Sequence, residues 1–200
     1  MNLNLIILVI VTIFLSGCSA THPPVSEYKI NAEYKTQAFE NSSCSNKSLK
    51  IAHSFSSPSL MSLKMDYGIG KVKQFSYTQS QWTQSPSSAI SLEILESLRE
   101  LKLFKSVQTS KSRSRSDMIL ETNIEDFMQY YNSDENISYV NSVISFTLID
   151  AKSNNVIAAK TFTSKVNVSS LNAEGGVKAL NSSLSTILVN SSKWFAKICQ

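Results

Sequence analysis

The chain has 200 residues, with 19 lysines and arginines against 15 aspartates and glutamates, so its formal net charge is +4. This small positive excess is compatible with an anionic membrane surface but gives no reason to expect a nucleic-acid partner. Only 5 residues are glycine, which argues against a glycine-rich phosphate-binding loop. The length is enough for one domain with a buried core.

The amino-terminal segment has the pattern of a bacterial lipoprotein signal peptide. Its apolar run at 5–15 matches the core of a signal peptide and is shorter than the roughly 20 residues of a membrane span. The run ends in Leu-Ser-Gly-Cys at 15–18, which resembles a lipobox. We therefore predict a signal peptide at 1–17, with diacylglycerol and an N-acyl chain attached to Cys18 and no other cofactor. An ordinary signal peptide that contains a cysteine is the alternative.

Two further cysteines, Cys44 and Cys199, remain in the mature chain. Two leftover thiols in an oxidising compartment often pair. We therefore predict a disulfide between them, which would tie the start of the domain to its last helix. Two unpaired thiols are the alternative.

Residues 18–26 are predicted to form a lipidated tether, because the prolines at 23 and 24 favour an extended chain. The domain at 27–200 follows, and alternation of apolar and polar residues predicts strands along most of it. Hairpin turns are predicted at 68–70, which contains two glycines, and at 151–155. The predicted strands are 28–34, 49–55, 60–67, 72–78, 104–109, 117–130, 136–150 and 156–168.

Two helices are predicted from apolar residues at helical spacing. Ser85 would cap the first helix, Pro86 suits its first position, and the helix ends near 103–104. Asn172 would cap the second helix, whose apolar stripe extends to Ile198. The order of elements predicts an α+β fold, a two-layer sandwich in which a mostly antiparallel sheet carries two amphipathic helices on one face.

The sequence offers few groups for catalysis. A hydrolase triad needs a base, usually histidine, but His22 lies in the tether and His53 lies in a predicted strand, where a buried structural role is the simpler interpretation. No histidine and cysteine cluster has metal-ligand spacing, and no nucleotide-binding motif is present. We therefore expect no catalytic residue and no metal site. Asn136 fits an acidic glycosylation sequence that some bacteria use, with an unmodified turn as the alternative.

Two surface features have both a structural and a functional interpretation. Lys111, Arg113 and Arg115 lie between two predicted strands, where they form either a solvated loop or a contact with anionic lipid headgroups or an acidic partner. Tyr77 and Trp82 precede the first helix. They either pack that helix onto the sheet or form an aromatic patch that binds a partner.

A set of short motifs follows in a specific order and spacing between residues 49 and 195. The most specific are the two motifs that flank the first predicted helix, Trp82 to Pro86 at its start and Phe104 to Val107 at its end. The others are Ser54-Phe55, Tyr67, Phe75-Ser76-Tyr77, Asp117 to Leu120, Phe146 to Asp150, Val156-Ile157, Ala179-Leu180-Asn181 and Trp194-Phe195. In these motifs the chain resembles the ABC-type transport auxiliary lipoproteins, the PqiC-like family. One departure is Gly68, where the family usually carries arginine.

The resemblance implies a non-enzymatic lipoprotein without ATPase activity. Its partners would be an MCE-type periplasmic protein and an ABC permease complex, which together move phospholipid or other hydrophobic molecules across the envelope. The lipid anchor would be its membrane contact, nucleic acid is not an expected partner, and a homo-oligomer is compatible with this role. Ser19 follows the lipidated cysteine, which favours the periplasmic face of the outer membrane over the inner membrane.

Two other interpretations stay open at this point. The first is a generic outer-membrane assembly or scaffolding lipoprotein, and the second is a secreted hydrolase. An adjacent gene for an MCE-type protein would favour the transporter assignment, whereas a cleft with a polar cluster of perturbed pKa would favour the hydrolase.

Overall fold

The computed structural model describes residues 23–35, 37–39, 42–70 and 72–200. The predicted signal peptide, Cys18 and His22 lie outside these residues. The described elements are β1 (Ser26–Tyr28), β2 (Ser48–Ile51), β3 (Phe55–Ser56), the 3-10 helix η1 (Pro58–Met61), β4 (Lys64–Ile69), β5 (Lys73–Trp82), α2 (Pro86–Glu100), β6 (Ser106–Gln108), β7 (Met118–Tyr131), β8 (Ser138–Asp150), β9 (Val156–Asn167) and α3 (Ala173–Ile198).

One nine-stranded sheet forms the body of the molecule, with β7 at its centre. The longest ladders are antiparallel and join β7 to β8 and β8 to β9. The hairpin between β4 and β5 and the turn between β8 and β9 are both confirmed. The α+β two-layer sandwich predicted from the sequence is thus the observed fold class.

Short parallel ladders line the other side of β7. β2, β3 and β4 pair with it one after another, with Leu49 opposite Met118, Phe55 opposite Asn123 and Tyr67 opposite Gln129. β6 extends this side through β2. These parallel pairings join segments far apart in the chain, so the alternation within each strand could not predict them.

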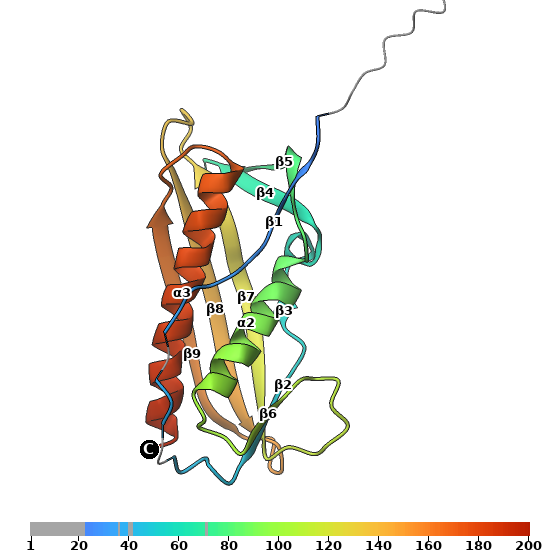
Figure 1. Cartoon of the computed structure of the whole chain (residues 1–200), viewed down its shortest axis with the longest axis vertical. Coiled ribbons are helices and arrows are strands. Elements are labelled where there is room, and N and C mark those ends of the chain that lie inside the picture. Colours follow the sequence, from blue (N-terminus) through green and yellow to red (C-terminus); the bar gives the residue numbers. More distant parts are fainter. Residues whose placement is uncertain (1–22, 36, 40–41, 71) are drawn as a thin grey trace, which may run out of the picture.

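The two helices form the second layer, and Figure 1 shows both in front of the sheet. α3 lies along β8 and β9, and α2 packs beside it. Along β8 the residues at every second position from Ser138 to Leu148 are buried, while those between are half-buried. Only one face of this part of the sheet is therefore covered. Among the described residues, no helix is both long and apolar enough to cross a membrane.

The helix starts follow the sequence signals only in part. Asn172 caps α3 as predicted, because its side-chain oxygen accepts a hydrogen bond of 2.9 Å from the N–H of Gly175. α2 does begin at Pro86, but the Ser85 side chain makes no capping bond. Its hydroxyl donates to the Ser88 hydroxyl instead, so the side-chain cap predicted for Ser85 is wrong.

The predicted strand at 49–55 is interrupted, and this inverts its second half. Between the pairs Ile51–Leu120 and Phe55–Asn123 the chain uses one residue more than β7 does. An extra residue moves every following side chain to the other face of a sheet. Ser54 and Ser56 are therefore buried, whereas His53 is exposed and Phe55 is 73% exposed. The buried role predicted for His53 is therefore wrong, and Phe55 lies away from the face that alternation with Leu49 and Ile51 would give it.

Two other predicted strands are shorter than expected. The segment at 60–67 starts as η1, which Pro58 initiates, and becomes extended only at Lys64. Of the predicted strand at 28–34 only Tyr28 is in a strand, as the last residue of β1, which pairs in parallel with the end of β5. The rest of that segment crosses α3, where the N–H of Asn31 donates to the Asn181 side chain at 3.1 Å.

Candidate functional site

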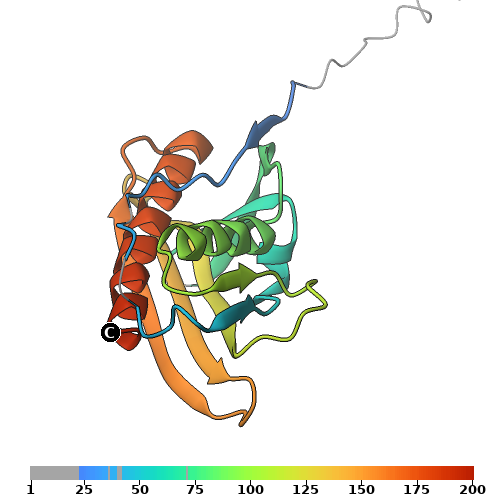
Figure 2. The same cartoon turned by 60° about the horizontal axis from the view of Figure 1, so that its bottom comes forward.

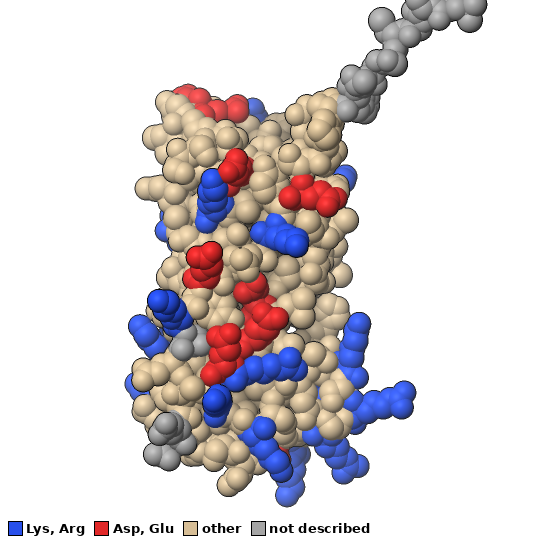
Figure 3. All heavy atoms as spheres, in the orientation of Figure 1, with Lys and Arg blue, Asp and Glu red and all other residues tan. Residues whose placement is uncertain are grey.

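One end of the molecule gathers exposed cations from four loops that are far apart in the sequence. Figure 3 shows lysine and arginine side chains around this lower end. We call these residues the basic end: Lys47, Lys102, Lys105, Lys111, Arg113, Arg115 and Lys152. Among the described residues beside these cations, two carboxylate side chains are present, Asp117 and, at the end of β8, Asp150. Since the whole chain has a net charge of +4, the rest of the protein is slightly acidic.

Strand pairing brings the four loops together. Ser48 pairs with Ser106, and Met118 pairs with both Leu49 and Asp150. The loops that precede β2, β6 and β7 therefore meet the β8–β9 turn at one end of the sheet. Because the pairing is long-range, this grouping of charge depends on the complete fold.

Hydrogen bonds hold these loops in place. The Lys50 ammonium donates to the carbonyl oxygens of Ser112 and Ser114 at 3.2 and 2.7 Å. The N–H of Lys105 donates to the carbonyl oxygen of Lys47 at 2.8 Å. The loop with Lys111, Arg113 and Arg115 is thus fastened to β2 by a side chain that does not itself belong to the exposed set.

Both carboxylates at the basic end are bonded to nearby backbone and hydroxyl groups. Asp117 Oδ2 accepts from the N–H and the hydroxyl of Ser48, each at 2.7 Å. Asp150 Oδ1 accepts from the N–H of Lys152 at 3.0 Å and from the N–H of Ser153 at 2.8 Å. These bonds lower the pKa of both carboxyls. The carboxylates therefore stabilise the loops without forming ion pairs with the exposed cations.

A shallow hollow of about 500 Å³ opens among these loops. Three exposed cations from three loops line it, namely Lys47, Arg115 and Lys152, together with Asp117 and Asp150. A concave surface with several cations suits the carboxylates of a partner, and arginine in particular can bind a carboxylate through two hydrogen bonds.

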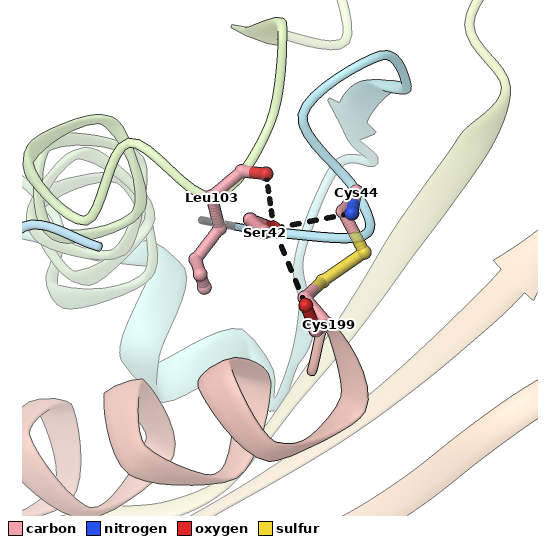
Figure 4. Close-up of a disulfide and its surroundings, with 4 residues drawn as sticks. All are labelled: Ser42, Cys44, Leu103 and Cys199. Carbon is pink, nitrogen blue, oxygen red and sulfur yellow. Dashed lines mark hydrogen bonds between the residues drawn. A yellow bond between two sulfur atoms is a disulfide. The ribbon is translucent and has the colours of Figure 1, made fainter. Parts of the chain in front are cut away.

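The disulfide predicted between Cys44 and Cys199 is present, and it fixes the loop that carries Lys47. Figure 4 shows it beside Ser42, whose hydroxyl donates to the Leu103 carbonyl oxygen at 2.8 Å and accepts from the Cys44 N–H at 3.1 Å. The Lys47 N–H in turn donates to the Cys44 carbonyl oxygen at 2.8 Å. The end of α3 is thus linked covalently to one edge of the basic end.

We expect Ser48→Ala to raise the pKa of the Asp117 carboxyl toward its ordinary value of 3.8, because the Ser48 hydroxyl is the main cause of its lowering. A carboxyl whose pKa is lowered by folding stabilises the folded state above its unfolded pKa, and this stabilisation is lost as the pH falls through the folded pKa. The measurement is a carboxyl NMR titration. Ser153→Ala, which acts on Asp150, is the matched control; an Asp117 pKa unchanged by Ser48→Ala would contradict this expectation.

Tyr77 and Trp82 do not form a surface patch. Trp82 is 4% exposed and belongs to the core, so the packing interpretation is right for it and the partner-binding one is wrong. Tyr77 is half-buried, and its hydroxyl lies 3.0 Å from Gln129 Oε1 and 2.7 Å from the Tyr131 hydroxyl. Its ring packs against Tyr67 with a centroid distance of 4.5 Å. These contacts pack the Tyr77 side chain against residues of β4 and β7, so it is not free to bind a partner.

His53 and Asn136, the other candidate residues, both lie on the surface. His53 lines a second hollow beside α2, with serine and apolar side chains around it. The described residues contain no group of three or more histidine, cysteine, aspartate or glutamate side chains that could hold a metal ion. Asn136 lies exposed in the β7–β8 turn, where its side-chain oxygen accepts a 2.7 Å hydrogen bond from the Asn132 amide.

Comparison with known proteins gives a likeness of structure only. No model of a protein family matches the chain, and no curated protein matches it. A crystal structure from Xanthomonas campestris, of the family DUF330, is similar with a TM-score of 0.75 at 14% identity, covering 86% of this chain and 96% of that one. A second crystal structure, of an uncharacterised protein, has a TM-score of 0.66 at 13% identity and covers 86% and 99%. At these identities the likeness indicates a shared fold.

Proposed function

We propose that this protein is a non-enzymatic, membrane-anchored periplasmic lipoprotein and an auxiliary component of an MCE-type ABC transport system. Its role would be to recruit the MCE-type periplasmic protein and the ABC permease complex to a site at the outer membrane, in a system that moves phospholipid or other hydrophobic molecules. The lipobox at Cys18 and the motifs between 49 and 195 support the assignment.

The observation that carries this proposal is the arrangement of the two ends. The described chain begins at Pro23, at the upper end of Figure 1, whereas the basic end is at the lower end. In Figure 2 the first described residues, in blue, again lie at the upper right of the body, away from the C-terminus. A protein attached to a membrane at one end and charged at the other suits the recruitment of a partner, and it requires no chemistry from the chain itself.

Gly68 stands where the family that this chain resembles usually carries arginine, and the structure gives a local reason for the difference. A Cβ atom at this position would lie 2.7 Å from Cδ1 of the Tyr130 ring. Tyr130 in turn donates its hydroxyl to both carboxylate oxygens of Asp126, at 3.0 and 2.9 Å. The ring therefore occupies the space that an arginine side chain would need, so a role for that arginine is not carried over to this protein.

We expect Cys18→Ser to abolish lipidation and removal of the signal peptide, so that the product keeps residues 1–17 and does not reach the outer-membrane fraction, because the Cys18 thiol accepts the acyl chains that anchor the protein at about 0.8 kcal/mol per buried methylene. The measurement is fractionation of cells that express the full chain, with the intact mass of the product. Cys44→Ser, which removes a cysteine outside the lipobox, is the control and stays in the membrane fraction. A Cys18→Ser protein that is processed and fractionates like the wild type would overturn the proposed function.

A further inference from the structure

We propose that the basic end is a docking surface for the acidic face of a protein partner, with the hollow among Lys47, Arg115 and Lys152 as its centre. The identity of the partner, an MCE-type periplasmic protein, rests on the proposed function. The chemistry of the surface is argued from its charge, its rigidity and its distance from the anchored end.

Among the described residues, no ion pair joins an exposed cation of the basic end to a carboxylate. The ion pair found within the described residues joins Lys178 to Glu174 on α3, which lies outside the four loops. Cations that repel one another raise the energy of the free protein, and an acidic surface removes that repulsion on binding. Charge complementarity therefore selects a partner that is negative over the area of this end.

The surface is also rigid before it binds. Lys50 fastens the loop of Arg113 and Arg115, the disulfide and its neighbouring hydrogen bonds fix Lys47, and Asp150 holds the turn of Lys152. Association loses less conformational entropy when the contact loops are already ordered. The backbone that carries these cations is thus held in place, while their side chains stay exposed to a partner.

The basic end is far from the end of the body that carries the anchor. β8 has 13 residues, which span roughly 43 Å at about 3.3 Å per residue. The chain from Cys18 to Pro23 reaches at most about 18 Å when fully extended, and charge interactions are screened over about 8 Å at physiological ionic strength. The anchored end and the basic end are therefore separated by the length of the sheet, and a body that stands upright on the bilayer presents its basic end to the periplasm, where the acidic face of a protein partner can reach it.

The test compares two triple charge reversals in the full, lipidated protein reconstituted in vesicles. The first combines Lys47→Glu, Arg115→Glu and Lys152→Glu, and so reverses the three cations that line the hollow. The matched control is Lys29→Glu, Lys64→Glu and Lys73→Glu, three exposed cations outside the basic end. The probes are the purified MCE-type protein and, separately, protein-free vesicles of phosphatidylglycerol. Circular dichroism and thermal unfolding confirm that both variants fold.

We expect the first variant to bind the MCE-type protein roughly 100-fold more weakly than the wild type, and the control to change binding by less than about 3-fold. Higher salt should weaken the wild type and leave the first variant nearly unchanged. Wild-type binding that survives the first reversal would overturn the docking inference alone. Loss of phosphatidylglycerol binding with intact protein binding would also overturn it, in favour of lipid headgroups. Absence of binding by all three forms would overturn the proposed transporter assignment.

Discussion

Replacing both Cys44 and Cys199 with serine lowers the free energy of unfolding by about 2–5 kcal/mol. The two residues are separated by 155 positions, so the bond closes most of the domain into one loop and restricts the unfolded chain strongly. Both cysteines are buried, at 3% and 1% exposure. The serine hydroxyls would need hydrogen-bond partners in place of the buried sulfur atoms, which adds to the cost.

Urea unfolding of the purified protein measures this effect. Reduced wild-type protein is the control for the cross-link itself and should unfold close to the double variant, whereas a reducing agent should leave the double variant unchanged. The Lys47 loop should also lose protection from amide exchange, because its link to α3 is cut. Equal unfolding free energies for the wild type and the double variant would contradict the structural role of the bond.

Phe146→Ala lowers the free energy of unfolding by about 3–5 kcal/mol. Phe146 lies in β8 at 1% exposure. Its ring packs edge-on against Phe162 of β9 and Phe195 of α3, with centroid distances of 5.9 and 5.8 Å. Its removal leaves a cavity between the sheet and α3 that the long, continuous strand cannot close.

The matched control is Phe55→Ala, the same change at a site that is 73% exposed. We expect it to alter stability by about 0.5 kcal/mol or less. The pair separates the observed structure from plain alternation along 49–55, which places Phe55 in the core. A cost for Phe55→Ala close to that of Phe146→Ala would show that the inverted register of β3 is wrong.

Local signals predicted the elements that are long and regular. The alternation in β8 and the apolar stripes of α2 and α3 extend over many residues, so these elements and their buried faces could be inferred from the sequence. β7 and β9 were predictable as strands, but register shifts along β7 and between β8 and β9 change their buried faces, which leaves Val156 60% exposed. The break between Ile51 and Phe55 could not be inferred, because the extra residue is defined only by the pairing with β7. The parallel position of β4 beside β7 has the same cause.

The candidate site was predictable only in its contiguous part. Lys111, Arg113 and Arg115 form a visible charge run, and the predicted turn at 151–155 placed Lys152 in a loop. Lys47, Lys102 and Lys105 are isolated in the sequence, and only the pairing of β2 with β6 and β7 brings them to the same end. For Tyr77 and Trp82 the sequence left the packing and the partner-binding interpretations open, because the inner face of their strand could not be assigned without its neighbours.

Purification of the native, lipidated protein from gently solubilised membranes tests the central claim, that this is an anchored recruiter for a lipid transport system. The measurement is the amount of MCE-type protein and ABC permease that is retained, relative to the same purification from cells with the Cys18→Ser chain. We predict that both partners are enriched with the lipidated protein and are lost with the variant. Retention of other envelope assembly proteins in place of these two would contradict the account.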